Sequence, residues 1–426
     1  MKKYLSTSGI IAVFVIAASA LTANAATMNI TAEFSPDINN PTKRDFINTT
    51  RQSGYCLEWP TQCTNGQVSI EMGGITARLS SSGFRANSEP REGMYFKMPG
   101  AWRDIIVRNS SDNTEHKVKF RVNAFSARYN TKNNWSLSEH QFSWSGSSFV
   151  NAPKPCNTSG VGVYPAYKYL WMWKWPESDS ACYKTAIREL TGEPYLVDNS
   201  SIGYQLIAPS PLAMNSGIYE GSLRFSVGPG GDIDFGDNLQ ASDTELTLNF
   251  RLTVSHELKV TPLSGATDVT LYPCYYRSKC SIDSAEENWE RWMVTNIPPQ
   301  KMSGLSEFNI SSSGSFTVYM MCGGGSAQSA DSCPMISNKS STVVPVKALL
   351  TLPDNITDQT GQRVVNKPLY TEKNISRNQF ITSSFGINQP GKIDFVIDKK
   401  DIGEMLKSRP DSWSGNVTII FDPNLY

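Results

Sequence analysis

The clearest pattern in the chain is an alternation of apolar and polar residues near its middle. Apolar side chains occupy every second position from Leu246 to Val254, with threonine, asparagine and arginine between them. Positions two apart on a β-strand point to the same face, so the pattern predicts a strand with one buried face. The same alternation over 222–227 predicts its partner, and segment 228–238 supplies the glycine and proline of a turn.

Shorter segments of the same kind recur along the chain, separated by turn residues. They predict strands at 68–72, 104–107, 117–122, 268–272, 315–321, 343–352 and 392–397. Helix signals are few. Segment 284–293 has Ser284 and Glu287 at capping-box spacing, and 400–408 is a second candidate. Many short strands with few helices predict an all-β fold of β-sandwiches rather than a parallel α/β fold.

The last strand signal lies at the end of the sequence. Val417, Ile419 and Phe421 alternate with other residues after Asn416, and Pro423 cannot continue a hydrogen-bonded ladder because it lacks an N–H group. Chain ends usually fray unless they are tied down. We therefore expect this strand to be paired in a sheet.

A change in pattern also marks a domain boundary. The long alternating strand ends near residue 256, and the turn-rich segment VTPLSG follows. We expect an N-terminal domain over 26–257 and a C-terminal domain over 258–426, each of ordinary domain size.

The first 25 residues have the features of a secretory signal peptide. Lys2 and Lys3 precede an apolar run over 10–21, and Ala23-Asn24-Ala25 fits a small-x-small cleavage site. We expect residues 1–25 to be removed on export. No later run of about 18 apolar residues indicates a membrane span.

Composition narrows the function classes. The chain has 39 basic and 39 acidic residues, and removal of Lys2 and Lys3 leaves 37 against 39, a net charge near −2. This balance argues against nucleic acid and anionic membranes as partners. Hydrophobic residues make up 39% of the chain and aromatic residues 11%, which favours a folded chain with a core over a disordered one.

The cysteines predict disulfides. All eight lie after residue 25 and form close couples in the sequence: Cys56 and Cys63, Cys156 and Cys182, Cys274 and Cys280, Cys322 and Cys333. An even count is typical of disulfides in exported proteins. Many connectivities are possible, so the pairing of neighbours is a hypothesis. We expect no metal site, because there is no C-x-x-C and the three histidines lack ligand spacing.

No catalytic motif stands out. The chain has no G-x-S-x-G, no H-E-x-x-H and no P-loop. The glycine-rich GPGGDIDFG lies between two predicted strands and leads into no helix, which favours a hairpin turn over a nucleotide loop. Paired carboxylates of a glycoside hydrolase cannot be identified without geometry. We expect a non-enzyme without a cofactor.

A cluster of aromatic residues lies between Cys156 and Cys182. Five of its members share one parity and would lie on one face of a strand: Tyr167, Tyr169, Trp171, Trp173 and Trp175. Two interpretations are open. An exposed aromatic face would bind a sugar ring or a protein receptor, whereas a buried one would form a sandwich core.

Several longer stretches carry a family resemblance. They are YCLEWPTQC near the start, GIYEGSLRFSVG and LTLNFRLTVSHELKVTPL in the middle, ATDVTLYPCYY after the boundary, and the final SWSGNVTIIFDPN. In layout and in these stretches the chain resembles the two-domain tip adhesins, or minor initiator subunits, of bacterial chaperone–usher fimbriae, especially the colonisation-factor type.

The resemblance implies two immunoglobulin-like β-sandwich domains. The N-terminal domain would bind a host glycan or glycoprotein, and the C-terminal domain would be a pilin domain that lacks one strand. A periplasmic chaperone would fill the gap first, and the next subunit's donor strand would fill it after passage through an outer-membrane usher to the cell surface. Asn416, Val417, Ile419 and Phe421 would then border the acceptor groove. A structural subunit without a receptor and a secreted carbohydrate-active enzyme are the alternatives.

Overall fold

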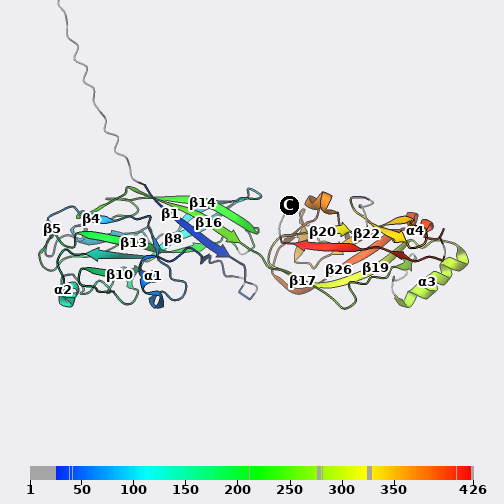
Figure 1. The fold of residues 1–426 in the computed structure, drawn as a ribbon, viewed down its shortest axis with the longest axis horizontal. Helices are drawn as coiled ribbons and strands as arrows, with labels where there is room; N and C mark the ends of the chain where they lie inside the picture. Colours follow the sequence, from blue (N-terminus) through cyan, green and yellow to red (C-terminus); the bar gives the residue numbers. More distant parts are fainter. Residues whose placement is uncertain are drawn as a thin grey trace, which may run out of the picture.

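The computed structural model describes residues 25–423 except 38, 41, 211, 276–279, 281, 324–328 and 409. The expected signal peptide therefore lies outside the described residues, apart from Ala25. Strands predominate and helices are few, so the predicted all-β class is confirmed. Two units follow each other along the long axis of the molecule (Figure 1). We call residues 25–254 the N-terminal unit and residues 258–423 the C-terminal unit.

The described residues of the N-terminal unit form sixteen strands and short helical turns. The strands are β1 (Ala25–Phe34), β2 (Ile47–Asn48), β3 (Ile70–Glu71), β4 (Ala77–Leu79), β5 (Gly83–Phe84), β6 (Met94–Lys97), β7 (Arg103–Asn109), β8 (Glu115–Asn130), β9 (Asn157–Thr158), β10 (Lys168–Lys174), β11 (Ala181–Lys184), β12 (Leu190–Thr191), β13 (Leu196–Ile207), β14 (Gly217–Ser226), β15 (Leu239–Ala241) and β16 (Glu245–Val254). The helices are α1 (Gly54–Glu58), α2 (Leu137–Phe142) and the 3-10 turns η1 (Pro60–Gln62) and η2 (Pro90–Glu92).

Most of these strands belong to one extended sheet system in the order β15-β4-β13-β8-β7-β14-β16-β1-β2. The predicted hairpin is confirmed, because β14 and β16 pair antiparallel from Gly217 opposite Val254 to Ser226 opposite Glu245. β1 runs parallel to β16 on its other side. The apolar positions of β16 are buried, as its alternation predicts, and they pack in one core with β1 and β8.

Part of this core is polar. His140 on α2 is fully buried, and its Nδ1 lies 2.7 Å from the hydroxyl oxygen of Tyr129 on β8. Its ring also packs against Tyr164, with ring centroids 4.7 Å apart. Burial disfavours the charged imidazolium and lowers the pKa of His140 to about 4.

The described part of the C-terminal unit forms twelve further strands. They are β17 (Leu258–Pro262), β18 (Tyr272–Cys274), β19 (Lys301–Ser312), β20 (Phe316–Cys322), β21 (Cys333–Ser337), β22 (Val343–Thr351), β23 (Ile356–Asp358), β24 (Lys367–Pro368), β25 (Gln379–Thr382), β26 (Gly386–Asp398), β27 (Trp413–Ser414) and β28 (Val417–Asp422). The helices are α3 (Ile282–Thr295), α4 (Lys399–Met405) and the 3-10 segment η3 (Glu372–Arg377).

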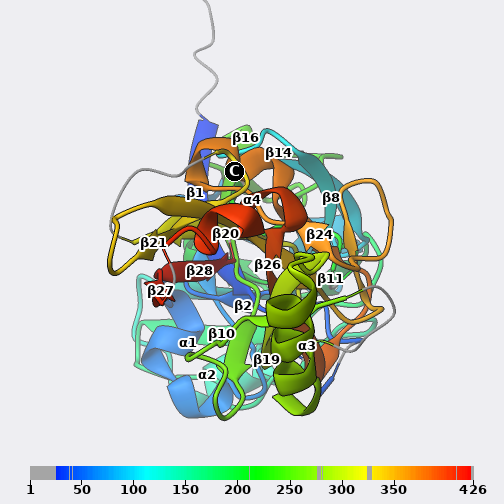
Figure 2. The same ribbon diagram turned by 90° about the vertical axis from the view of Figure 1, so that its right-hand side faces the viewer.

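Two sheets build this unit. One has the order β17-β19-β26-β22-β21-β27, and the other has the order β23-β25-β20-β28. Phe308, Phe316 and Leu350 are among the side chains buried between them. At the end far from the N-terminal unit, α3 and α4 cover a second, smaller core, and Figure 2 looks onto this end of the molecule.

Two sequence-based predictions for the C-terminal unit are wrong in detail. The predicted capping box at Ser284 is not at a helix start, because α3 already begins at Ile282. Segment 268–271 is not a strand, although β18 begins at Tyr272. Its alternation of apolar residues is real, but no ladder with a neighbouring strand forms there.

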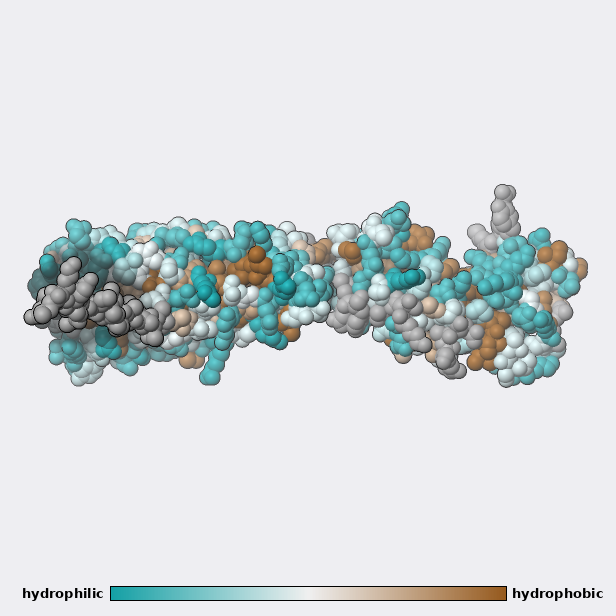
Figure 3. Space-filling model, turned by 90° about the horizontal axis from the view of Figure 1, so that it is seen from above, coloured by the Kyte–Doolittle hydropathy of each residue, from teal (hydrophilic) through white to brown (hydrophobic). Residues whose placement is uncertain are grey.

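A short joint connects the two units. The backbone carbonyl oxygen of Glu257 accepts a hydrogen bond from the backbone N–H of Ser313 (3.0 Å), and the Glu257 N–H donates to the Ser313 hydroxyl (2.7 Å). His256 lies between the units, with Nε2 2.6 Å from the Met214 carbonyl oxygen. A Cβ atom on Gly314 would overlap the His256 ring, so the joint requires glycine at this position. The face of the molecule that Figure 3 shows is mostly hydrophilic.

The joint yields the first prediction. Gly314→Ala should force the His256 ring out of its site and destabilise the protein by about 1–3 kcal/mol, as overpacking usually does. Small-angle scattering should also show a broader distribution of maximum dimensions. The matched control is Gly403→Ala, because no atom lies within 4 Å of a Cβ at Gly403. Equal stabilities and scattering curves for the two variants would contradict the assigned packing.

The buried histidine, His140, yields the second prediction. Because the folded-state pKa of His140 is below its unfolded value, the unfolded chain binds the extra proton first as pH falls. Stability should therefore be full above about pH 6.5 and should decrease by up to about 3 kcal/mol toward pH 4. Chemical denaturation at several pH values measures this slope. His140→Gln, which cannot take up a proton, should flatten it, and an unchanged slope in that variant would refute the assignment.

Candidate binding groove of the C-terminal unit

β28 lies at the edge of its sheet. It pairs antiparallel with β20, from Val417 opposite Cys322 to Asp422 opposite Thr317. Among the described residues, no second strand pairs with its other edge. The predicted terminal strand therefore exists and is paired, but only on one side. Its free edge presents backbone N–H and C=O groups to any extended chain that lies beside it.

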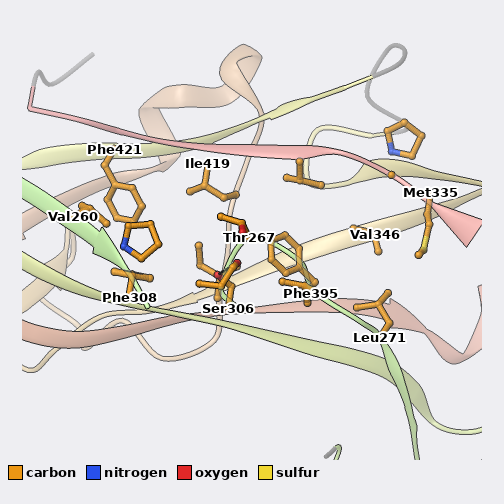
Figure 4. A pocket seen from close by; sticks show the side chains of 17 residues that line it. Val260, Thr267, Leu271, Ser306, Phe308, Met335, Val346, Phe395, Ile419 and Phe421 are labelled. Atoms are coloured by element: carbon orange, nitrogen blue, oxygen red, sulfur yellow. Dashed lines mark hydrogen bonds between the residues drawn. The ribbon is translucent and has the colours of Figure 1, made fainter. Parts of the chain in front are cut away.

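A groove of about 460 Å³ runs along this free edge. Side chains from β28 form one wall, and β17 with segment 266–271 forms the other (Figure 4). The lining residues are Val260, Pro262, Ala266, Thr267, Val269, Leu271, Ser306, Phe308, Pro334, Met335, Val346, Ile393, Phe395, Gly415, Val417, Ile419 and Phe421.

The side chains that line the groove are almost all apolar. Thr267 and Ser306 contribute the hydroxyl groups, and no charged side chain is among these lining residues. Figure 4 shows Phe421 and Ile419 pointing from β28 into the groove, toward Val260 and Phe308. The Phe421 ring meets Phe308 edge to face, with centroids 5.2 Å apart. The groove opens directly into the core between the two sheets, so its floor is core surface.

The alternation of β28 places its predicted residues. Val417, Ile419 and Phe421 line the groove, as their shared parity requires. Asn416 does not line it: its carbonyl oxygen accepts a hydrogen bond from the backbone N–H of Gly323 (2.9 Å) and thereby anchors the start of the strand. Three of the four residues predicted to border an acceptor groove therefore line the groove of this structure, and Asn416 positions the strand; their role in assembly stays a prediction.

Two local features hold β28 in place. Just before it, the chain crosses from β27 in one sheet to β28 in the other, and a Cβ on Gly415 would come within 2.6 Å of the Pro334 carbonyl oxygen. Glycine therefore permits the crossing. The disulfide Cys322–Cys333 ties the end of β20 to the start of β21. It therefore joins the two sheets at the end of the groove where β28 begins.

The opposite wall is the part that the sequence-based site prediction omitted. Val269 and Leu271 line the groove from segment 268–271, which has no ladder partner. Their alternation was visible in the sequence as a predicted strand. The signal was therefore present, but an alternating segment does not tell whether its neighbour is supplied by the same chain.

The predicted disulfides form between neighbours. All eight cysteines are paired, as Cys56–Cys63, Cys156–Cys182, Cys274–Cys280 and Cys322–Cys333. The hypothesis of neighbour pairing is confirmed. Each bridge closes a local loop, with sequence separations from 6 to 26 residues.

The predicted aromatic face is not exposed. Tyr169, Trp171, Trp173 and Trp175 are all buried, and they pack with Phe96, Phe125 and Phe149. As a solvent-facing receptor surface the prediction is wrong for these four residues, and the core interpretation is the correct one. Tyr167 is 53% exposed and lies just before β10. Trp173 Nε1 donates to the Phe149 carbonyl oxygen (2.6 Å) and Trp175 Nε1 donates to the Ser180 carbonyl oxygen (3.0 Å), whereas Trp171 Nε1 is buried without a hydrogen-bond partner among the described residues.

The other face of β10 is covered as well. Leu170 and Met172 are buried beneath α1, where they contact Tyr55 and Cys56 in a small second core. The loop closed by Cys56–Cys63 supplies this cover. Both faces of β10 are therefore internal, which leaves no room for an aromatic binding platform on this strand.

Metal sites and membrane-spanning helices are the other features of functional interest. In the part of the chain that the structure describes, no group of three or more His, Cys, Asp and Glu side chains could hold a metal ion. Within the same residues, no helix is long and apolar enough to cross a membrane.

Comparison with known proteins gives whole-chain structural matches. No family model and no curated protein matches the sequence. Among solved structures, a chaperone–tip adhesin complex of CFA/I fimbriae matches 94% of this chain and 97% of its own, at 10% identity and a TM-score of 0.23.

Two other solved structures match over a similar length. A point mutant of the CFA/I adhesin CfaE of enterotoxigenic E. coli matches 95% of this chain and 94% of its own, at 8% identity and a TM-score of 0.27. The CsuC–CsuE chaperone–tip subunit pre-assembly complex of archaic chaperone–usher pili from Acinetobacter baumannii matches 93% and 98%, at 10% identity and a TM-score of 0.22. The three matched structures are thus tip adhesins or chaperone–tip complexes, at identities of 8–10% and TM-scores of 0.22–0.27.

Proposed function

We propose that the chain is a tip adhesin or minor subunit of a fimbrium, and that its C-terminal unit is completed by a strand from another protein. The observation that carries this proposal is the apolar groove beside the free edge of β28. An extended peptide would pair with the backbone of β28, and its alternate side chains would enter the groove. Domains over 26–257 and 258–426, one for a receptor and one for assembly, are part of the proposal.

The chemistry of the groove favours a peptide strand over a small polar ligand. Its lining offers apolar side chains and two hydroxyl groups, and it lacks the convergent charged groups that orient a substrate. An uncovered apolar edge is also an aggregation hazard. A periplasmic chaperone that lends a strand would remove the hazard until a subunit replaces it, and an outer-membrane usher would then pass the assembled chain to the cell surface.

The N-terminal unit is assigned the receptor function in this proposal. Its core is closed, and β10 is covered on both faces. A host glycan or glycoprotein would therefore bind to surface loops rather than to the tryptophan cluster. Tyr167 is the member of the original aromatic set that remains available for stacking on a sugar ring.

The groove can be tested with a synthetic strand. A peptide of about 12 residues, with valine at every second position and threonine between, extends about 40 Å at about 3.3 Å per residue and is therefore longer than the six-residue β28. It should bind residues 26–426 and raise the Tm. Ile419→Asp should weaken the binding about 10- to 100-fold, because one buried aliphatic side chain contributes about 1.5–3 kcal/mol. The matched control is Ile387→Asp, at an exposed position outside the groove.

The same protein allows a test of the alternatives. Expression in a periplasm with and without a fimbrial chaperone should give soluble protein only as a one-to-one complex. A chain that folds alone as a stable monomer and binds neither chaperone nor peptide would overturn the proposal and favour a secreted carbohydrate-active enzyme. Glycan screening of the complex separates an adhesin from a structural subunit without a receptor.

A further inference from the structure

We propose that one exposed stripe of α3 contacts the folded body of the subunit that lends its strand to the groove. This inference rests on the proposed function and adds to it a second contact surface. The stripe consists of Ile282, Trp289 and Met293. Ile282 is 71% exposed and Met293 is 59% exposed, while Trp292 on the adjacent side of the helix is buried.

Helix geometry places the three residues together. They are separated by seven and four positions, which are spacings that return to the same side of an α-helix. The stripe is physically continuous with the groove. Trp289 stacks on Trp292, with ring centroids 5.1 Å apart and the planes 10° from parallel. Trp292 packs in the same small core as Leu271 and Val417, which line the groove.

The groove has two ends, and only one leaves room for a second folded protein. Val260, Phe308 and Phe421 lie at one end, where β17 approaches β28 and begins directly after the joint. At that end, Glu257 is bonded to Ser313, and the N-terminal unit follows. Leu271 and Met335 lie at the other end of the groove (Figure 4).

A strand donor must therefore place its body at the far end. The strand itself is extended, and a short connection cannot carry the chain back past the N-terminal unit. The far end is the one that α3 occupies, beyond β18 and opposite the joint (Figures 1 and 2). The folded part of a subunit that is held there by its donor strand therefore lies adjacent to the stripe.

Charge indicates the kind of surface that fits. Between the stripe residues, α3 carries Asp283, Glu286, Glu287 and Glu290 against one cation, Arg291, which gives the helix a net charge of −3. The Arg291 guanidinium is engaged over the Tyr275 ring, 4.7 Å from its centroid. The complementary surface on the donor is an apolar patch flanked by lysine or arginine side chains.

Site-specific photo-crosslinking in assembled fimbriae tests the contact. Benzoylphenylalanine would replace Met293 at the stripe, Ile420 beside the groove, and Val365 as a control. Val365 is 58% exposed and follows β22, which ends at the joint side of the unit. Fimbriae sheared from the cell surface exclude complexes that remain in the periplasm. Mass spectrometry then identifies each adduct.

The expected result is that positions 293 and 420 link to the same partner chain, position 420 to an extended segment and position 293 to the folded body. Position 365 should give no adduct with that chain. An adduct at 420 without one at 293 would overturn the α3 contact and leave the proposed function intact. Absence of an adduct at 420 would instead show that the proposed strand addition fails, and the inference with it.

A second measurement separates the contribution of the stripe to binding from the contribution of the groove. Met293→Glu should speed dissociation of the strand-donating subunit about 5- to 20-fold, because it places a charge in an apolar contact beside other carboxylates. The same variant should bind the isolated valine–threonine peptide as tightly as the unaltered protein. Val365→Glu is the matched control and should change neither value. Equal dissociation rates for Met293→Glu and Val365→Glu would overturn the proposal.

Discussion

The free edge of β28 is the constraint on which the C-terminal unit depends. A strand in a sandwich normally satisfies its backbone groups on both sides and buries its apolar face beneath a neighbour. Here one ladder is made, with β20, and the apolar face remains open as a groove. Gly415 and the Cys322–Cys333 bridge hold β28 in the position in which it forms one wall of the groove. These features keep the site formed before any partner strand arrives.

The two units differ in how the apolar side chains of a strand are covered. In the N-terminal unit, β10 has apolar side chains on both faces, and the chain supplies a cover for each: the main core on one side and the disulfide-closed loop of α1 on the other. Every large apolar side chain of β10 is therefore buried within the unit. Among the described residues of the C-terminal unit, no equivalent cover lies along β28. Under the proposed function, dependence on a second protein is thus a property of one unit and not of the whole molecule.

Sequence periodicity predicted which residues share a face, and it succeeded where one face is buried. The alternation of β16 identified its core side, and the alternation of β28 identified Val417, Ile419 and Phe421 as residues of one face. It failed for Trp171 and Trp173 because parity does not say which face is internal, and on β10 both are. It also could not separate a strand that pairs within the chain from segment 268–271, whose ladder partner is not part of this chain under the proposed function. Both failures come from long-range packing, which local pattern does not encode.

The joint lies at one end of the groove, so the two ends of the groove differ. Leu258 begins β17 two residues after His256, and Val260 on the same strand lines the groove. β17 pairs with β19, whose last residue, Ser312, precedes the Ser313 that bonds to Glu257. One short strand therefore connects the joint to the groove wall. A partner strand that packs against Val260 would hold β17 against β19 and would restrain the segment that carries His256. Completing the sandwich would in this way stiffen the connection to the N-terminal unit, at the end of the groove farthest from the partner's own body.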